Sequence, residues 1–516
     1  MNIRDYVARD SGHFEGLVRL QAEANRAKTA VICNEDRLTY GELDRRVERI
    51  AAALQRDGVR TRGAVGICAA SSVDYIAVFL GILRAGATVA PLSTAATAEQ
   101  LAAMVRDCGA SHLFTDEEAS RLLAPVEAIL PVRRIALDTG ADGEAFQEWL
   151  APEGAQAAPV EIEPDQAFNI IYSSGTTGTP KGIVQSQRMR WYQVIRTDPP
   201  GYTPEAITIL STPLYSNTTL TSLIPTLAGG GTLVLMPKFD ARRFLELCET
   251  HRVNVAMLVP VQYRRILAVP DFDRFDLSSF RMKFATSAPF PAELKAEVLR
   301  RWPGGLIEYY GMTEGGGTCM LLAHEHPDKL HTVGQPIPGH DMKVIDDEGR
   351  VLPPGQAGEV VGRSESMMNG YHNRPDKTAE AEWISPEGLR YIRTGDVAIL
   401  DEQGFMTLIG RKKDMIISGG INVYPIDLER ALCDHPAVHE AAVVGAPSLE
   451  WGETPVAFVT LNERTGARPE ELLAFANAKL GKMQRISEVR IVEALPRNSV
   501  GKILKRELQH ALMTTD

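Results

Sequence analysis

A short apolar run that leads into a loop of small residues constrains this chain more than any other stretch. Residues 168–172 have the pattern of a buried strand. Residues 173–182 then read Ser-Ser-Gly-Thr-Thr-Gly-Thr-Pro-Lys-Gly. Glycines let a backbone approach a ligand closely, and successive N–H groups form a nest for anions. The stretch therefore predicts a phosphate-gripping loop, in which Lys181 supplies one positive charge.

Two other interpretations of this loop compete with the phosphate site. A flexible Gly/Thr linker is disfavoured, because linkers rarely follow a buried strand and rarely end in Pro-Lys-Gly. A Walker loop, G-x-x-x-x-G-K-[ST], is disfavoured by the spacing. Only two residues separate Gly175 from Gly178, and Gly182 rather than serine or threonine follows Lys181.

Composition excludes several classes of protein. The 516 residues are enough for more than one domain. The 66 acidic and 55 basic residues give a net charge of −11, which disfavours a nucleic-acid partner. The N-terminus lacks an apolar signal region, and the longest apolar run, residues 75–83, is too short to cross a bilayer. The six cysteines are scattered without a C-x-x-C pair, so we expect reduced thiols in a cytoplasmic protein.

Strand and helix patterns alternate along most of the chain. Thr39 and Glu42 form a capping box at the start of a helix. A strand at 64–69, a helix at 73–85 and a strand at 88–92 predict a right-handed parallel crossover. Further strands are expected at 206–210, 232–236, 253–259, 282–285 and 306–310, with helices at 241–250, 261–267 and 291–302. This is a doubly wound α/β pattern, in which ligands bind at the carboxyl ends of strands. The phosphate loop, residues 287–289 and the segment after residue 309 all follow strands and are expected to converge there.

The segment Tyr310-Gly311-Met312-Thr313-Glu314 follows the last of these strands. It offers an aromatic face for a purine, a hydroxyl group and a carboxylate. Magnesium bound to nucleotide phosphates takes only one or two protein carboxylates, so a single glutamate is enough for such a site. Read alone, the segment is also compatible with a strand that simply ends in a turn.

The pattern changes after about residue 412. Helices at 426–433 and 470–480, with strands at 440–444, 456–461 and 488–495, predict a small α+β domain of about 100 residues. Before it, Asp396 ends a segment at a turn, and Arg411 lies in a Gly-Arg-Lys-Lys-Asp sequence. The chain closes with a basic segment that contains Gly501-Lys502. Without further context this segment could be a basic tail on a solvated helix.

Taken together and in this order, these motifs resemble those of the adenylate-forming superfamily, which comprises acyl-CoA ligases, adenylation domains and luciferases. The resemblance extends from Leu38 to Arg506 and includes residues 38–43 and 83–92, which are similar to early core motifs of that family. It implies an α/β fold with a large N-terminal domain of doubly wound α/β subdomains, residues 1–412. A small mobile α+β C-terminal domain, residues 413–516, would pivot at Lys413.

The resemblance also implies roles for individual residues. The implied catalytic residues are Lys502, Glu314 and Thr313, and the implied metal ligands are Glu314 and Thr176. The ATP- and AMP-binding residues are expected to be Ser173, Ser174, Gly175, Thr176, Thr177, Gly178, Lys181, Ser287, Ala288, Pro289, Tyr310, Gly311, Met312, Asp396 and Arg411. Tyr310 would lie beside adenine, and Asp396 would accept hydrogen bonds from both ribose hydroxyls, which the two oxygens of a carboxylate allow.

The acid pocket and the acceptor site are implied by weaker matches. The expected pocket residues are Tyr215, Ser216, Thr219, Gly315, Gly316 and Gly317, together with Ser287. Ser216 departs from the histidine of many CoA ligases and from the aspartate of amino-acid-activating domains, which disfavours an amino-acid substrate. The glycines after Glu314 would leave room for a ring or a branched acid, or would form a flexible loop. The expected coenzyme A contacts are Ser418, Gly419, Gly420 and Trp451.

The function implied is that of an acyl-CoA ligase that uses ATP, Mg²⁺ and coenzyme A. An aromatic, short-to-medium or branched carboxylic acid is the expected substrate, with no nucleic acid and no membrane span involved. A carrier-protein thiol or luciferase-like oxidation would share the same first half-reaction, and a homodimer is left open. From another class, an ATP-binding hydrolase or regulatory module would explain the phosphate loop but not Lys502.

Overall fold

The structure is a computed structural model that describes residues 3–9, 11–173, 181–192, 201–418, 421–448, 451–462, 466–481, 484–498 and 501–513. The chain divides into two compact units. The first comprises Met1–Leu330, Pro336–Asp341 and Gly362–Ile392, and the second comprises His331–Gln335, Met342–Val361 and Arg393–Asp516. The expected pivot at Lys413 lies inside the second unit, and the boundary between residues 412 and 413 stays a prediction.

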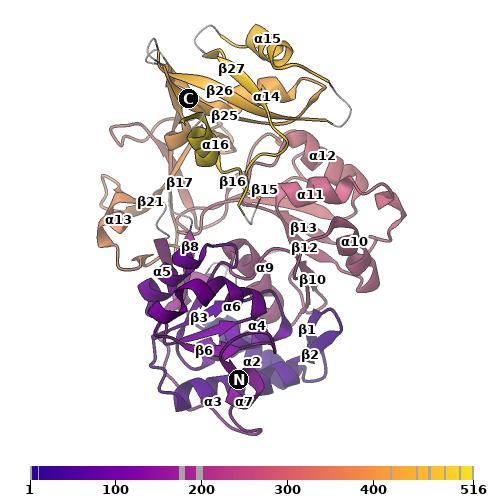
Figure 1. Cartoon of the computed structure of the whole chain (residues 1–516), viewed down its shortest axis with the longest axis vertical. Coiled ribbons are helices and arrows are strands. Elements are labelled where there is room, and N and C mark those ends of the chain that lie inside the picture. The colour runs from indigo at the N-terminus through magenta and orange to yellow at the C-terminus, as the bar shows by residue number, and fades with distance from the viewer. Residues whose placement is uncertain are drawn as a thin grey trace. The chain divides into compact units, whose positions relative to one another are not determined.

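The first unit contains an eight-stranded sheet in the order β19-β9-β8-β4-β3-β5-β6-β7. Figure 1 labels its strands β3, β6 and β8. Its strands are β3 (Ala64–Cys68), β4 (Thr88–Pro91), β5 (His112–Thr115), β6 (Arg133–Ala136), β7 (Glu144–Ala145), β8 (Ala167–Ser173), β9 (Lys181–Ser186) and β19 (Gly370–Tyr371). The strands β3 and β4 pair in parallel, as the strand–helix–strand pattern predicted. At the other edge β8, β9 and β19 pair antiparallel.

A nine-stranded sheet has the order β16-β15-β14-β13-β12-β10-β11-β1-β2. Its strands are β1 (Thr29–Cys33), β2 (Asp36–Thr39), β10 (Ile207–Leu210), β11 (Thr232–Leu235), β12 (Val255–Leu258), β13 (Met282–Ala285), β14 (Gly305–Tyr310), β15 (Cys319–Leu322) and β16 (Gln335–Pro336). The run from β10 to β14 is parallel, which confirms the alternating α/β pattern.

Helices connect and cover the strands of both sheets. They are α1 (Ile3–Val7), α2 (Phe14–Ala24), α3 (Tyr40–Arg56), α4 (Val73–Arg84), α5 (Ala98–Cys108), α6 (Glu117–Leu123), α7 (Phe146–Trp149), α8 (Gln187–Arg190), α9 (Asn217–Ala228), α10 (Ala241–Thr250), α11 (Pro260–Leu267), α12 (Ala292–Arg301) and α13 (Pro375–Glu380). The capping box predicted at Thr39 is present, with both reciprocal hydrogen bonds to Glu42. Pro291 lies at the N-cap of α12, one residue before the first turn where we expected it.

The helix α4 packs between the two sheets. It contacts β3 and β4 of one sheet and β1 and β2 of the other. Every residue of α4 except Asp74 is buried, which is the pattern of a helix enclosed on all sides. Its one buried charge, Arg84, forms ion pairs with Glu15, Asp44 and Glu48, as a buried charge requires.

Two further sheets follow. One has the order β17-β18-β21-β20 with β22 beside β21, and consists of β17 (Asp341–Ile345), β18 (Ala357–Arg363), β20 (Glu382–Ile384), β21 (Arg390–Leu400) and β22 (Met406–Arg411). The other has the order β24-β23-β26-β25 with β27 beside β26, and consists of β23 (Ile416–Ser418), β24 (Ile421–Val423), β25 (Val438–Ser448), β26 (Gly452–Leu461) and β27 (Glu488–Ile491). The last strand ends four residues before the expected Leu495.

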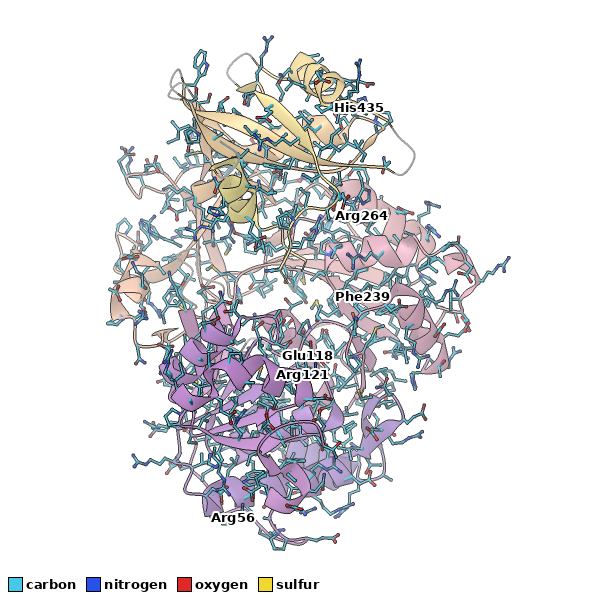
Figure 2. The ribbon with its side chains drawn as sticks, viewed as in Figure 1. Arg56, Glu118, Arg121, Phe239, Arg264 and His435 are labelled. Carbon is cyan, nitrogen blue, oxygen red and sulfur yellow. The ribbon has the colours of Figure 1, made fainter. Side chains whose placement is uncertain are left out.

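Helices α14 (Pro425–Cys433), α15 (Pro469–Lys479) and α16 (Lys505–Met513) belong to the second unit. The first two confirm the helices predicted there. Just after α14, His435 packs edge-on against Phe475 of α15, with ring centroids 4.8 Å apart. Figure 2 labels His435. Aliphatic side chains fill the space between α14, α15 and the sheet, so this region has its own core.

Across the described ranges, no helix is both long enough and apolar enough to cross a bilayer. All six cysteines lie in those ranges and form no disulfide, and all but Cys433 are buried.

Candidate active site

The phosphate loop is carried by an antiparallel pair of strands. The strands β8 and β9 pair from Ala167 opposite Ser186 to Ser173 opposite Lys181. A strand, rather than the helix that a Walker loop opens, therefore follows the loop. Ser174, Gly175, Thr176, Thr177 and Gly178 lie outside the described residues, as does the Ser173 side chain. The structure therefore describes the two strands that flank the loop, called its stem below. Lys181 is the first residue of β9 after the loop.

Two of the three predicted loops lie side by side at one sheet edge. The strands β13 and β14 are parallel neighbours, so Ser287-Ala288-Pro289 and the segment from Tyr310 to Glu314 both follow their carboxyl ends. Ser287 has a φ of +79°, and its hydroxyl lies 2.5 Å from that of Thr218 in α9. The phosphate loop follows a strand of the other sheet, since β8 belongs to the eight-stranded sheet, so the expected convergence involves strand ends of two sheets.

Side chains nevertheless connect the phosphate-loop stem to the Glu314 segment. The Gln185 amide of β9 donates a 2.7 Å hydrogen bond to the carbonyl of Thr313. The Tyr371 hydroxyl, from β19, donates a 2.7 Å hydrogen bond to Oε1 of Glu314. The ring of Tyr371 also lies under Lys181, whose Nζ is 5.2 Å from the ring centroid. Burial and the Glu314 carboxylate raise the pKa of Tyr371 far above that of a free tyrosine.

A buried arginine, Arg190, hydrogen-bonds to three elements of the same region. Arg190 of α8 is 1% exposed, and burial lowers its pKa to about 9. Its guanidinium donates hydrogen bonds to the side-chain oxygens of Asn169, Gln185 and Asn217. Because these residues lie on β8, β9 and the first turn of α9, Arg190 joins three elements that border the predicted site. Sequence reasoning did not find Arg190 or Tyr371, because neither belongs to a motif with a recognisable spacing.

The predicted acid-pocket residues gather around the start of α9 and after Glu314. Tyr215 and Ser216 are half-buried before the first turn of α9. Thr219 is fully buried, and its hydroxyl donates to the carbonyl of Pro213 at 2.6 Å. That hydroxyl is therefore engaged in holding the loop before α9, so Thr219 is more suited to shaping the wall than to binding a polar group.

Backbone conformation and close packing, rather than the expected room for the acid, explain why glycines stand at positions 315 and 316. Gly315 and Gly316 have φ values of +75° and +90°, a region that favours glycine. A Cβ on Gly315 would lie 1.8 Å from the carbonyl oxygen of Ser366, and one on Gly316 would lie 2.8 Å from that of Gly362. Close backbone approach thus requires both glycines, whether or not the loop is flexible. They do not by themselves indicate extra room for the acid.

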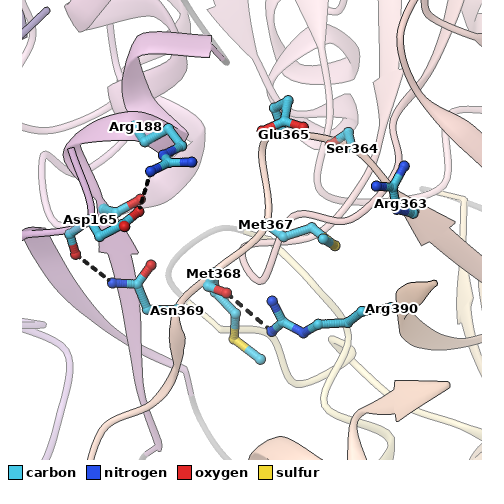
Figure 3. A pocket seen from close by; sticks show the side chains of 10 residues that line it. Asp165, Arg188, Arg363, Ser364, Glu365, Met367, Met368, Asn369 and Arg390 are labelled. Atoms are coloured by element: carbon cyan, nitrogen blue, oxygen red, sulfur yellow. Dashed lines mark hydrogen bonds and ion pairs between the residues drawn. The ribbon is translucent and has the colours of Figure 1, made fainter. Parts of the chain in front are cut away.

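An open pocket of about 360 Å³ is lined in part by residues of the segment 363–369, which contains Ser366 (Figure 3). Its walls include Arg188, which pairs with Asp165 at 3.0 Å, and Arg390, which donates to the carbonyl of Met368 at 3.3 Å. None of the residues predicted for the site from the sequence lines this pocket, so it does not correspond to the predicted acid pocket.

In the second unit, Asp396 and Arg411 form an ion pair. They face each other across β21 and β22, with Oδ1 of Asp396 2.7 Å from Nε of Arg411. The expected turn at Asp396 was wrong: this residue lies inside β21, directly after Gly395, which has a φ of +68°. A register shift follows between Val397 and Ala398, so the local irregularity is a bulge within a strand rather than a turn.

Two lysines share the surroundings of this ion pair. Lys502 remains exposed, yet the protein around it partly desolvates its ammonium, and this effect together with Arg411 lowers its pKa. Asp396 is close enough to oppose that shift. Lys413 lies in the short 3-10 turn Lys412–Asp414, and burial is the main cause of its lowered pKa. The structure thus brings together Asp396, Arg411 and Lys502, which are far apart in the sequence.

Two of the residues predicted to contact coenzyme A, Ser418 and Trp451, lie at neighbouring strands of one sheet. Ser418, at the end of β23, is buried and pairs with Gly452 of β26. Trp451 precedes Gly452 and is 38% exposed, which makes it one of the few large exposed apolar side chains. Gly419 and Gly420 lie outside the described residues.

Comparison with known proteins explains this arrangement. The AMP-binding enzyme family matches residues 18–372, and the AMP-binding enzyme C-terminal domain matches residues 427–502. The chain belongs to the AMP-binding enzyme family. It is a member of the adenylate-forming acid ligases, as its motifs indicated.

Two relatives illustrate the range of this family. An indoleacetate–CoA ligase from Aromatoleum aromaticum is 33% identical over 491 residues, which cover 93% of this chain and 94% of that protein. The fatty acid–[acyl-carrier-protein] ligase ScoC from Streptomyces coeruleorubidus is 33% identical over 492 residues, which cover 93% of this chain and 92% of the relative.

Solved structures of the same family share the fold. The amide bond synthetase McbA from Marinactinospora thermotolerans has a TM-score of 0.85 at 28% identity, with 96% of this chain and 99% of that chain covered. ATP-bound MatB from Rhodopseudomonas palustris has a TM-score of 0.85 at 27% identity, with 98% and 99% covered. The anthranilate CoA ligase AuaEII, in complex with anthranoyl-AMP, has a TM-score of 0.87 at 25% identity, with 99% of both chains covered.

The surroundings of Glu314 in this AMP-binding enzyme fit a magnesium ion held mainly by nucleotide phosphates. No group of three or more His, Cys, Asp or Glu side chains in the described part of the chain could hold a metal alone. A single carboxylate is sufficient when phosphates complete the coordination. Oε1 of Glu314 accepts from Tyr371, and no other described side chain hydrogen-bonds to the carboxylate. Thr176, the other predicted ligand, lies outside the described residues.

Proposed function

We propose that this AMP-binding enzyme is a carboxylic acid–CoA ligase. It joins an acid to ATP to form an enzyme-held acyl-adenylate with release of pyrophosphate. It then transfers the acyl group to the thiol of coenzyme A with release of AMP. The acid is proposed to be aromatic or a short-to-medium or branched aliphatic acid, since the relatives named above act on indoleacetate and on fatty acids.

The observation that carries this proposal is the position of Lys502 beside the Asp396–Arg411 pair. A carboxylate and a nucleotide phosphate repel each other, so their reaction needs a cation that no protein carboxylate has already neutralised. Among the described residues, no carboxylate lies within ion-pair distance of the Lys502 ammonium, whereas the nearby Lys505 ammonium lies 2.6 Å from Glu429. This difference supports Lys502 as the cation that faces the substrate.

The proposed first step forms one bond and breaks one. A carboxylate oxygen of the acid attacks the α-phosphorus, and the bond from that phosphorus to the pyrophosphate oxygen breaks. Lys502 is proposed to neutralise the substrate carboxylate and the α-phosphate oxygens, and Lys181 to bind the leaving phosphates. A magnesium ion on Glu314 would supply further charge neutralisation for the phosphates. Asp396 is proposed to accept hydrogen bonds from the ribose hydroxyls.

The proposed second step is an acyl transfer from the adenylate to a thiol. The thiolate of coenzyme A attacks the acyl carbon, the bond from that carbon to the AMP phosphate oxygen breaks, and AMP leaves. Ser418 and Trp451 are proposed to line the path of the thiol carrier, and Lys413 is the proposed pivot between the two steps. Similarity to ScoC favours a carrier-protein thiol as the alternative acceptor, and McbA shows that relatives of this fold also form amides.

A pyrophosphate-release assay with a panel of acids tests this function. We expect pyrophosphate and AMP only when an aromatic or aliphatic acid is present, and a stoichiometric acyl-CoA product when coenzyme A is added. Formation of ADP, or pyrophosphate release that needs no acid, would refute the proposal. Parallel reactions with a phosphopantetheinylated carrier protein and with a simple amine identify the acceptor by the product formed.

A further inference from the structure

Residues 366–372, called the strap below, connect two parts of the first unit's site. One end is hydrogen-bonded to the Glu314–Gly316 segment, and the other end pairs with β9. At one end, the N–H of Gly316 donates to the carbonyl of Ser366 at 3.1 Å, and that of Met368 donates to the carbonyl of Glu314 at 2.8 Å. At the other end, Gly370 and Tyr371 pair with Val184 and Ile183 of β9. The strap therefore connects the backbone of Glu314 with the strand that begins at Lys181.

The strap has little freedom to shift relative to Glu314. Ser366 approaches Gly315 so closely that a side-chain carbon at position 315 would overlap its carbonyl. Beyond Tyr371, the N–H of His372 donates to the carbonyl of Gly182 at 2.7 Å. The Tyr371 N–H donates to the hydroxyl of Thr378 at 2.9 Å, which anchors it to α13. The backbone that carries Tyr371 is thus fixed on three sides.

From this position Tyr371 touches both charged groups of the site. Its hydroxyl is protonated near neutral pH and is the donor to Oε1 of Glu314, while its ring faces the Lys181 ammonium. A carboxylate whose one oxygen already accepts a strong hydrogen bond has a preferred orientation. Hydrogen bonds of this kind to a metal-binding carboxylate orient it, and their loss typically costs about 10–100-fold in metal affinity or activity.

We propose that Tyr371 is a positioning residue that holds the Glu314 carboxylate so that Oε2 binds the divalent cation through a single oxygen. The same side chain keeps the Lys181 ammonium beside that cation's phosphate ligands. The proposal rests on the proposed function for the identity of the nucleotide, but its test does not need the acid or the acyl product.

Substituting Tyr371→Phe tests the hydroxyl alone, since phenylalanine keeps the ring that faces Lys181. Binding of Mn²⁺ in the presence of a non-hydrolysable ATP analogue, followed by electron paramagnetic resonance, gives the metal affinity directly. We expect Tyr371→Phe to weaken Mn²⁺ binding about tenfold. In the acid-dependent assay, saturating Mg²⁺ should restore kcat, because the defect lies in metal affinity.

Tyr371→Leu removes the ring as well and extends the test to Lys181. It should weaken binding of the ATP analogue measured without divalent cation, whereas Tyr371→Phe should leave that metal-free affinity unchanged. Tyr40→Phe is the matched control, because the Tyr40 hydroxyl is buried and donates at 2.7 Å to the carbonyl of Gly231, away from Glu314 and Lys181. Its Mn²⁺ affinity should equal that of the unaltered protein.

Two results would overturn the proposal. One is an unchanged Mn²⁺ affinity in Tyr371→Phe while Glu314→Gln loses it. The other is an equal loss in Tyr371→Phe and Tyr40→Phe, which would indicate a general effect on the fold. Neither result would touch the proposed function, whose own failure would appear as an unaltered protein that forms no AMP with any acid.

Discussion

Replacing Lys502 by alanine should separate the two half-reactions. The truncation removes one positive charge and leaves the backbone in place, since the Lys502 N–H, which donates to the Asn498 side chain at 2.8 Å, is retained. No ion pair to the ammonium is lost within the described residues, so the free energy of unfolding should change by less than about 0.5 kcal/mol. The expected defect is therefore in catalysis rather than in folding.

The size of that defect follows from the role proposed for the ammonium. Removing one preorganised donor that stabilises developing charge typically lowers kcat by about 10²–10³, or roughly 2.7–4 kcal/mol. We expect Lys502→Ala to reduce acid-dependent pyrophosphate release by this factor. Thioester formation from supplied acyl-adenylate and coenzyme A should stay within about twofold of the unaltered protein, a difference of under about 0.5 kcal/mol.

Lys505→Ala is the matched control for this experiment. It removes the same charge three residues away, but from an ammonium that already pairs with Glu429 at 2.6 Å. Adenylation should be unaffected, and stability should fall by at most about 1 kcal/mol. An equal loss of both half-reactions in Lys502→Ala, or an equal loss of adenylation in the two variants, would refute the reasoning.

Three further predictions follow from the same structure. Because the pKa of Lys502 is lowered, the adenylation rate should fall as pH rises through a midpoint below that of an ordinary lysine, and Lys502→Arg should move this alkaline limb to higher pH in a pyrophosphate-release profile. Trp451→Ala should raise the KM for coenzyme A about tenfold, since stacking on a base contributes about 1–3 kcal/mol, and leave pyrophosphate release unchanged; an unchanged KM would place Trp451 outside the site. Lys283→Leu should lower the free energy of unfolding in urea by about 3 kcal/mol, because the buried ammonium of this β13 residue caps the carbonyls of Trp302, Pro303 and Gly304, while Arg300→Leu, at an exposed position of α12 just before those carbonyls, should stay within about 0.5 kcal/mol.

Elements with strong local signals could be predicted from the sequence. The helix that begins at Thr39 was found because its capping box is a local pattern, and β13 was found because short apolar runs between helices mark parallel strands. No strand of the sheet of β17, β18, β20, β21 and β22 was predicted, because these strands are partly exposed and carry charged residues such as Arg393 and Asp396. Asp396 was assigned to a turn because Gly395 looks the same in a turn and in a bulge.

The candidate site was predictable where a motif carries the chemistry. Lys181, Glu314, Asp396, Arg411 and Lys502 belong to such motifs, and the structure brings the last three together in one unit. Tyr371 and Arg190 could not be predicted in the same way. Their contacts depend on strand order and on the strap, and a single sequence does not reveal which distant segments become neighbours.

The close packing of Gly315 against Ser366 has a consequence for efforts to redirect this protein to new acids. Mutant libraries aimed at Gly315 and Gly316 would consist mostly of chains in which this packing cannot form, since a β-carbon at either position meets a carbonyl oxygen. Diversity is better directed to Tyr215 and Ser216, whose half-buried side chains precede α9.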